Sequence, residues 1–481
     1  MFSLSIGQAF SFIINVAAII LAARFLGVES FGYFSNVLAI VSILSKIVDF
    51  GIEPIIFREF SKNIKNFAVF NTGLTLRFSI YILLLIGFNI TAPLLNITFN
   101  DIILYNVLFT TILISMKMLN VRELLSTPFK ATLKMHYPMT LSIIDNLLLL
   151  CLILFIPLIK DKIFFFTLFY AASNLPGFIL MFYILYKKFG YKFKINFDKG
   201  LWIAKESFPL FGLVVLNILY MQIDIIILNN FSSYYDVGIY SAAIRLTMPL
   251  NIIPQAIVTT VFPILVKKLS DKIDTSSLTN MVIKMLFVIS FLLFIIFCFK
   301  SESLILLLFG NDYKSAALPA IILYCSQIFI FFTYYSQAIL IADYRQKFNF
   351  LYGLILVVIN LLICFLLIPH YSFIGAAVAK LVASFASFIF VLVILKKLGF
   401  LPSIGRYRVL LWSLIIGLVF YAVSIFPLPF YLILSPFIIV ILTAVIKLFS
   451  KDEMNILFKL INSEKFGQKI LSKIYGSSDV D

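Results

Sequence analysis

The sequence predicts an all-α integral membrane protein with about 14 transmembrane helices. Its 481 residues are 62% hydrophobic and 12% charged, with a mean hydropathy of +1.08, which leaves too little polar surface for a water-soluble fold. The apolar runs continue for about twenty residues, the length that an α-helix needs to cross a bilayer. Strands of an outer-membrane barrel would instead alternate over segments of about ten residues, so we expect helical spans.

The apolar runs define the expected spans in order along the chain. The first begins at the N-terminus without a basic region and is too long for a signal peptide, so we interpret it as a retained helix. In the eighth, Pro249 and Pro254 each remove a backbone donor and predict a kink or an unwound turn. The expected spans are about 2–23, 34–57, 68–92, 101–121, 138–159, 163–186, 208–230, 239–264, 281–300, 317–341, 348–369, 373–395, 409–427 and 430–449.

Lysine and arginine are distributed unevenly over the loops between these spans. Of the 38, 27 fall in the tail or in loops that follow even-numbered spans, and six fall within spans. The opposite side has only Arg24, Lys160, Lys162, Lys300 and Lys314. Because cytoplasmic loops are enriched in Lys and Arg, this pattern predicts that both termini are cytoplasmic. It also explains the net charge of +16 without a nucleic-acid partner.

The chain carries an internal repeat. The motif GYFS at 32–35 returns as GIYS at 238–241, an offset of 206 that also aligns the starts of the first and seventh spans. Because six is an even number of helices, the repeats would have the same topology, with a substrate site between them near mid-membrane. We expect an N-terminal lobe at 1–190, a basic cytoplasmic linker at 191–207, a C-terminal lobe at 208–397, two added helices at 398–449 and a basic amphipathic cytoplasmic tail at 450–481.

Several ionisable residues fall inside the expected spans, where a charge costs about 2.5–3.5 kcal/mol or more. Lys46, Asp49 and Glu53 are spaced to lie on one stripe of the second helix. The other deep residues are Arg77, Asp145, Asp224, Arg245 and Lys380, while Lys117 and Lys284 are expected to extend to the cytoplasmic interface. These residues either form interhelical pairs that fix packing or line a hydrated path. Polar neighbours at helical spacing, such as Ser241 before Arg245 and Ser384 after Lys380, favour the path.

The sequence gives no sign of a cofactor. Cys151, Cys298, Cys325 and Cys364 are isolated in apolar runs, and His136 and His370 have no companion ligand. No GxxxxGK[ST] loop is present, so we do not expect this chain to hydrolyse ATP. An ion gradient or the membrane potential is then the expected energy source. Asp49, Asp145 and Asp224 are the candidate coupling residues, because a buried carboxylate can be neutralised in one state.

Four segments resemble a known family: ARFLGVESFGYFS at 23–35, DFGIEPIIFRE at 49–59, IDIIILNNFSSYYDVGIYSAAIRL at 223–246 and IPHYSFIGAAVAKL at 368–381. They are similar to the polysaccharide biosynthesis (O-antigen type) flippases of the multidrug/oligosaccharidyl-lipid/polysaccharide (MOP, MATE-like) exporter superfamily. The resemblance implies a two-lobed transporter that works by alternating access. Its implied substrate is an undecaprenyl-pyrophosphate-linked oligosaccharide, moved across the bacterial cytoplasmic (inner) membrane for O-antigen or capsule biosynthesis.

A pyrophosphate headgroup needs cations in a low-dielectric setting. Our candidate substrate-binding residues are Arg24 at the outer mouth, then Lys46, Arg77, Arg245 and Lys380. A MATE-type multidrug antiporter is the first alternative, although organic cations would favour an acidic cavity. A membrane-embedded polymerase or ligase is the second, but the largest outer loop, 301–316, has no histidine or DxD-like cluster, so we do not expect an enzyme. The basic tail predicts contact with membrane lipids and leaves open a dock for polysaccharide assembly enzymes.

Overall fold

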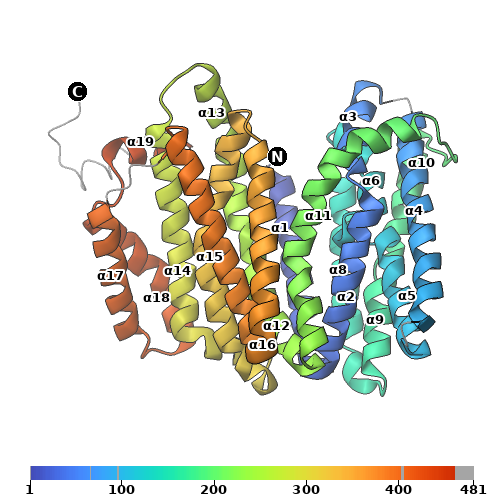
Figure 1. Cartoon of the computed structure of the whole chain (residues 1–481), viewed down its shortest axis with the longest axis horizontal. Helices are drawn as coiled ribbons and strands as arrows, with labels where there is room; N and C mark the ends of the chain where they lie inside the picture. The colour runs from blue at the N-terminus through green and yellow to red at the C-terminus, as the bar shows by residue number, and fades with distance from the viewer. Residues whose placement is uncertain (1, 65–66, 95–96, 402–405, 461–481) are drawn as a thin grey trace. The chain divides into compact units, whose positions relative to one another are not determined.

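The computed structural model describes residues 2–64, 67–94, 97–401 and 406–460, and every regular element in these ranges is helical (Figure 1). The longer helices are α1 (Phe2–Leu26), α2 (Val28–Asp49), α3 (Ile52–Lys62), α4 (Phe67–Leu94), α5 (Phe99–Ile114), α8 (His136–Ile153), α9 (Lys162–Ala172), α10 (Leu175–Phe189), α11 (Gly200–Phe231), α12 (Tyr234–Thr247), α13 (Ile252–Ser270), α14 (Ser276–Leu308), α15 (Ala317–Ala342), α16 (Lys347–Lys397), α17 (Arg406–Val423), α18 (Leu428–Val445) and α19 (Lys451–Leu460). Short elements between them are η1 (Met116–Met118), α6 (Val121–Leu125), α7 (Thr127–Ala131), η2 (Ile156–Leu158), η3 (Met248–Asn251) and η4 (Asn311–Ala316).

The expected membrane class is confirmed. Within the described ranges, 9 segments are long and apolar enough to cross a bilayer, and three shorter apolar helices accompany them. The spanning segments are 67–94, 136–158, 162–189, 200–231, 234–270, 276–308, 311–342, 347–397 and 428–445, and the shorter helices are 10–26, 99–114 and 407–423. The protein is therefore a multi-pass helical membrane protein, while the count of fourteen spans stays a prediction.

The expected second span is shorter than predicted and is followed by a separate helix. Helix α2 ends at Asp49, because Phe50 and Gly51 take left-handed conformations with φ of 49° and 68°. Glycine suits position 51 for two reasons. It adopts a positive φ without strain, and a Cβ there would lie only 3.0 Å from the Phe211 nitrogen of α11. The predicted single stripe is thus wrong, because Glu53 belongs to α3 and not to the helix that carries Lys46 and Asp49.

Three other expected spans are interrupted. The eighth is broken at η3, which contains Pro249, so the predicted unwinding at this proline is confirmed. The sixth is broken at Ser173 and Asn174, between α9 and α10. In the fourth expected span, the helix ends at Ile114 and the chain continues as irregular backbone. Helix α16 joins the expected eleventh and twelfth spans across Ser372, where φ is 47° and ψ is −128°, so the chain makes two helices there.

Contacts between α-carbons divide the chain into two units. The first consists of Met1–Ala242 with Ile368–Phe373, and the second of Ala243–Leu367 with Ile374–Asp481. Helix α11, expected to open the second lobe, falls in the first unit because it packs along α2. Within the second unit, α14 packs against α15, and α17 and α18 pack against each other and against α14. The lobe boundaries at 190 and 208 stay a prediction.

The two copies of the repeat motif touch each other within the first unit. A Cβ on Gly32 would collide with the Tyr234 carbonyl oxygen and lie 2.7 Å from the Gly238 nitrogen, and a Cβ on Gly238 would collide with the Val28 carbonyl oxygen. The offset of 206 relates Gly32 to Gly238 and Val28 to Tyr234. The contact is therefore reciprocal, which is the pattern of a local two-fold relation. Glycine is required at both positions because the backbones of α2 and α12 approach so closely.

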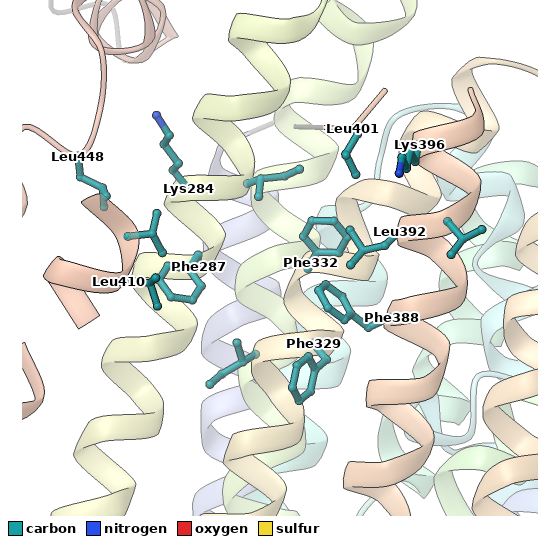
Figure 2. Close-up of a pocket in the computed structure, with 14 residues that line it drawn as sticks. Lys284, Phe287, Phe329, Phe332, Phe388, Leu392, Lys396, Leu401, Leu410 and Leu448 are labelled. Atoms are coloured by element: carbon teal, nitrogen blue, oxygen red, sulfur yellow. The ribbon is translucent and has the colours of Figure 1, made fainter. Parts of the chain in front are cut away.

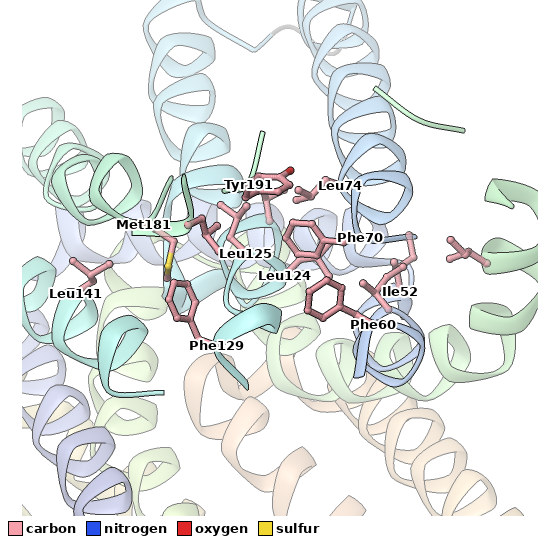
Figure 3. Packing of buried hydrophobic residues seen from close by; sticks show 14 residues of the cluster. Ile52, Phe60, Phe70, Leu74, Leu124, Leu125, Phe129, Leu141, Met181 and Tyr191 are labelled. Carbon is pink, nitrogen blue, oxygen red and sulfur yellow. The ribbon is translucent and has the colours of Figure 1, made fainter. Parts of the chain in front are cut away.

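A buried apolar cluster holds α3 in place in the first unit (Figure 3). Ile52 and Phe60 of α3 pack with Phe70 of α4 and Leu124 of α6, all at 0–1% exposure. Tyr191 closes the cluster and its hydroxyl donates a 2.8 Å hydrogen bond to the Asn71 side-chain oxygen. The cluster fixes α3, α4 and α6 around the irregular segment that follows α5.

Candidate functional site

The irregular segment between α5 and α6, residues 115–120, is the feature around which the buried charges of the first unit gather. After Ile114 the chain forms η1, then Leu119 is left-handed with φ of 49° and Asn120 has φ of −132° and ψ of −120°. Ser115 and Asn120 are fully buried. Irregular backbone inside a membrane protein leaves carbonyl groups without helical partners, so side chains must supply the donors.

Arg77 supplies one of these donors. Its fully buried guanidinium, on α4, forms an ion pair with the Asp49 carboxylate of α2. The Arg77 Nη1 also donates a 2.5 Å hydrogen bond to the Asn120 carbonyl oxygen, and the Asn120 side-chain nitrogen donates a 2.5 Å hydrogen bond to the Ser45 carbonyl. Arg77 therefore joins α2, α4 and the irregular segment.

Lys46 contacts the same segment from α2. Its half-buried ammonium donates to the carbonyl oxygens of Met118 and Leu119, at 3.4 Å each. The Ser45 hydroxyl donates to the Met118 carbonyl at 3.3 Å. The ion pair of Asp49 is with Arg77, whereas Lys46 of the same helix is bound by backbone carbonyls.

A second buried ion pair brackets the other end of the segment. Arg122 of α6 pairs with Asp145 of α8 and donates from Nη1 to the carbonyl oxygens of Ile114 at 3.2 Å and Asn174 at 3.3 Å. Arg122 lies between the apolar helices 99–114 and 136–158, as a loop position predicts, but the break after Ile114 turns its side chain into the protein, where it is 0% exposed. Gly177 of α10 faces the pair so closely that a Cβ would collide with both side chains.

Glu53, removed from the predicted stripe, joins a separate and more exposed group. The Lys130 ammonium of α7 donates to Glu53 at 2.7 Å and to Glu123 at 2.9 Å, with all three side chains about one fifth exposed. Burial lowers the pKa of Lys130, but the two carboxylates raise it more, so the net pKa lies above the ordinary lysine value. Lys130 therefore stays protonated and links α3, α6 and α7.

The remaining candidate residues lie apart from this segment. In the first unit, Arg24 near the end of α1 is exposed, and Asp224 of α11 is fully buried and accepts a hydrogen bond from the Tyr240 hydroxyl. In the second unit, Arg245 of α12 is half-buried, and Lys380 in the second half of α16 is 1% exposed. The structure thus joins Lys46, Asp49 and Arg77 at one segment and places Asp145 at its other end.

The two lysines expected to extend to the cytoplasmic interface each contact a neighbouring side chain, and their position relative to the membrane stays a prediction. Lys284 of α14 is 9% exposed and its ammonium donates to both carboxylate oxygens of Glu453 in α19, at 2.9 and 2.8 Å. Lys117 of η1 lies over the Tyr170 ring, 4.8 Å from its centroid. A nearby carboxylate or aromatic face stabilises each cation at its place in the protein.

Several residues of the site were not predicted from the sequence. Asn120, Arg122 and Asn174 matter because the fourth and sixth spans are broken. The fourth has no proline or glycine at its break, whereas in the sixth Pro176 at the start of α10 was a signal that the sequence analysis did not use. Tyr240 lies in the repeated motif, yet its contact with Asp224 depends on tertiary packing. Within the described ranges, no group of three or more His, Cys, Asp or Glu residues could hold a metal ion.

Comparisons with known proteins agree with this architecture. The structure of a lipid II flippase, MurJ, in an inward closed conformation superimposes with a TM-score of 0.76 at 16% identity, covering 96% of this chain and 100% of that one. An inward-facing MATE family multidrug resistance transporter of the MOP superfamily gives a TM-score of 0.56 at 15% identity, covering 81% and 95%. The fold is therefore the one expected, shared with a flippase and with a transporter.

The sequence comparisons identify the family. Capsular polysaccharide biosynthesis protein CapF of Staphylococcus aureus is 29% identical over 205 residues, which are 41% of this chain and about half, 52%, of that relative. The family model described as polysaccharide biosynthesis protein matches residues 1–269, more than half of the chain. The chain therefore belongs to the family of polysaccharide biosynthesis proteins.

Proposed function

We propose that this protein is a flippase that moves an undecaprenyl-pyrophosphate-linked oligosaccharide from the cytoplasmic to the outer leaflet of the cytoplasmic membrane. The observation that carries the proposal is the combination of family and fold: a polysaccharide biosynthesis protein with the architecture of a lipid flippase. The product of the step would be the lipid-linked unit on the outer face, available for assembly into O-antigen or capsule.

The negative charge of the substrate's pyrophosphate headgroup gives the candidate arginines and lysines a binding role. A pyrophosphate carries about two negative charges, and arginine and lysine are its natural receivers in a dry cavity. Arg24, Lys46, Arg245 and Lys380 are the residues that we propose for this role. Arg77 has weaker support, because its charge is already balanced by Asp49 and its Nη1 is bound to the Asn120 carbonyl. Lys46 has the clearest case in the first unit, since its hydrogen-bond partners are neutral carbonyls.

Transport of an anion against its desolvation needs a source of energy. We propose that a carboxylate couples an ion gradient to the conformational cycle, with Asp49, Asp145 and Asp224 as the candidates. Protonation or sodium binding at Asp49 or Asp145 would break a buried ion pair with an arginine, which is costly. Asp224, which is fully buried, accepts a hydrogen bond from the Tyr240 hydroxyl.

The loop charges give the proposed orientation. The excess of lysine and arginine in loops after even-numbered spans supports cytoplasmic termini in an inner-membrane protein. Helix α19 carries the described part of the tail, and residues 461–481, including Lys465, Lys469 and Lys473, lie outside the described residues. We propose anionic membrane lipids as a partner of this basic end, and polysaccharide assembly enzymes as further partners.

A multidrug antiporter is the second candidate, favoured by the MATE fold neighbours. Organic cations need an acidic site, whereas the buried carboxylates Asp49 and Asp145 are each neutralised by an arginine. Lys380 adds a further buried cation in the second unit. This charge balance and the capsular relative support the flippase over the antiporter.

Charge removal tests the proposal. Arg24, Lys46, Arg245 and Lys380 are each changed to Gln, and the surface polysaccharide and the membrane content of the protein are measured in cells. We expect normal insertion, because the loop charges that set topology are untouched, together with loss of surface glycan. Exchange to the other cation should restore part of the glycan. Normal glycan in all four Gln variants would contradict the cationic route.

A further inference from the structure

The second unit contains an apolar groove of about 720 Å³ whose rim carries two lysines (Figure 2). Its lining includes four aromatic side chains, Phe287 of α14, Phe329 and Phe332 of α15, and Phe388 of α16. Lys284 and Lys396 lie toward one end of the groove in Figure 2, with the phenylalanine rings below them. An apolar chamber with cations at one end matches an amphiphile with a hydrocarbon chain and an anionic headgroup.

A carboxylate of the chain itself lies at this rim. Glu453 of α19 is 3% exposed and accepts two hydrogen bonds from the Lys284 ammonium, at 2.9 and 2.8 Å. The same carboxylate accepts from the Ser450 backbone nitrogen at 2.7 Å, while the Ser450 hydroxyl accepts from the Glu453 nitrogen at 3.2 Å. These two hydrogen bonds form a capping box at the start of α19. The Glu453 side chain therefore does two things: it starts the tail helix and it balances the charge of Lys284.

Lys284 would be costly to bury without a partner. Removing one member of a buried ion pair leaves an uncompensated charge, so a group that replaces Glu453 must be an anion. A lipid phosphate fulfils this condition, since lysine binds phosphate as a point charge. Leu448, just before α19, also lines the groove, so displacement of Glu453 would loosen the segment that covers this end.

We propose that the groove is a binding site for an anionic phospholipid of the bilayer, with its phosphate at Lys284 and one acyl chain against the phenylalanines, and that Glu453 is an internal competitor for this phosphate. Helix α19 is then a latch that is fixed when Glu453 holds Lys284 and released when the lipid takes its place. This inference goes beyond the proposed flippase function and does not depend on it, because the lipid binds as an effector and is not transported.

The chain contains a suitable reporter. Trp412 of α17 is fully buried, and its ring centroid lies 5.9 Å from that of Phe287, a residue of the groove. The other tryptophan, Trp202, lies in the first unit and is replaced by phenylalanine to leave a single fluorophore. Brominated acyl chains quench tryptophan only at short range, so a chain in the groove would quench Trp412 beyond the level given by surrounding lipid.

The full-length Trp202→Phe protein is reconstituted in vesicles of phosphatidylcholine that contain increasing amounts of brominated phosphatidylglycerol or brominated phosphatidylcholine. We expect Glu453→Gln to raise the preference for the anionic lipid about fivefold, the effect of one unopposed lysine near an anionic headgroup. Asp452→Asn is the matched control, because it removes the same charge from the neighbouring, exposed position. It should leave the preference unchanged, whereas Lys284→Gln should abolish it.

Three outcomes would overturn the inference. Equal quenching by the two brominated lipids in the parent and in Glu453→Gln would show that Lys284 selects no phosphate. A preference that survives Lys284→Gln would place the anionic site elsewhere. Loss of quenching on adding a small amount of unbrominated polyprenyl phosphate would assign the groove to a polyprenyl chain. If Glu453→Gln fails to fold, the double variant Lys284→Gln/Glu453→Gln takes its place, because it leaves no unpaired charge buried. This double variant must lack the preference for anionic lipid that the parent protein shows.

Discussion

At the scale of single residues, the buried charges of the first unit divide into those that hold the structure and those available for transport. Arg77 binds the Asp49 carboxylate and the Asn120 carbonyl, and Arg122 binds the Asp145 carboxylate and the carbonyls of Ile114 and Asn174. Each cation therefore adds a donor to backbone carbonyls at a point where a helix is interrupted. Both arginines therefore serve the fold first, whatever they contribute to substrate binding.

The Arg77 and Asp49 pair should behave as one structural unit. Asp49→Asn or Arg77→Gln alone leaves a buried charge unpaired and should cost about 3–5 kcal/mol of stability. The double variant should cost clearly less than the sum of the two, because no unpaired charge remains. Unfolding of the purified protein in detergent measures all three. Glu206→Gln, which removes an exposed partner of Arg58, is the control and should leave the unfolding midpoint unchanged. Additive single effects would mean that the two residues act independently.

Asp224 should be separable from that structural role. We expect Asp224→Asn to fold normally but to lose the stimulation of transport by an imposed proton or sodium gradient, measured by labelling of lipid-linked sugar in sealed vesicles. Tyr240→Phe removes the hydrogen bond and keeps the carboxylate, so it should retain the stimulation. Gradient-driven transport in Asp224→Asn at the level of the parent protein would remove Asp224 from the coupling mechanism.

At the scale of elements, the sequence predicted which segments are helical more accurately than where the helices break. Apolar runs of span length led to helices because the bilayer requires every backbone group to be bonded within the segment. The break at Pro249 could be predicted, since proline removes a donor. The break at Ser173 has a local signal in Pro176, which takes a first-turn position of α10, although the sequence analysis did not use it. The break after Ile114 has none, and it is stabilised by the tertiary partner Arg122.

The same limit applies to the candidate site. Burial of Asp49, Asp145 and Asp224 followed from their position in apolar runs, but their partners did not. Arg122 stood among loop cations in the sequence, and Glu53 stood on the stripe of Lys46 until Phe50 and Gly51 ended the helix. Pairing across elements depends on packing, which periodicity alone does not determine.

The contact between the two motif glycines is a sharp test at the element scale. Gly32→Ala and Gly238→Ala should each destabilise the protein by about 1–3 kcal/mol, because the new methyl group collides with backbone that cannot rotate away. The two losses should be similar, since the contact is reciprocal. Gly87→Ala in α4, where a Cβ meets nothing within 4 Å, is the matched control and should be neutral or slightly stabilising. Thermal unfolding in detergent measures all three, and a neutral Gly32→Ala would contradict the close approach.

At the scale of the whole molecule, family and fold point to the same process. The chain belongs to a polysaccharide biosynthesis family and has the architecture of a lipid flippase, and the part of it that the structure describes has no cluster of metal-binding residues. Its buried cations suit an anionic headgroup, and its carboxylates offer a means of coupling to an ion gradient. The proposed flippase would use these cations and carboxylates together, whereas an antiporter for organic cations would leave the cations without a role.

The most direct test is the leaflet on which lipid-linked sugar accumulates when the protein is removed. The gene is deleted in the host, sealed membrane vesicles of both orientations are prepared, and exposed sugar is labelled with a lectin. We expect complete undecaprenyl-linked units to accumulate on the cytoplasmic face, with the outer face depleted, and the parent gene to restore the outer signal. Complete units that reach the outer face but remain unpolymerised or unligated would contradict flipping and identify a later step.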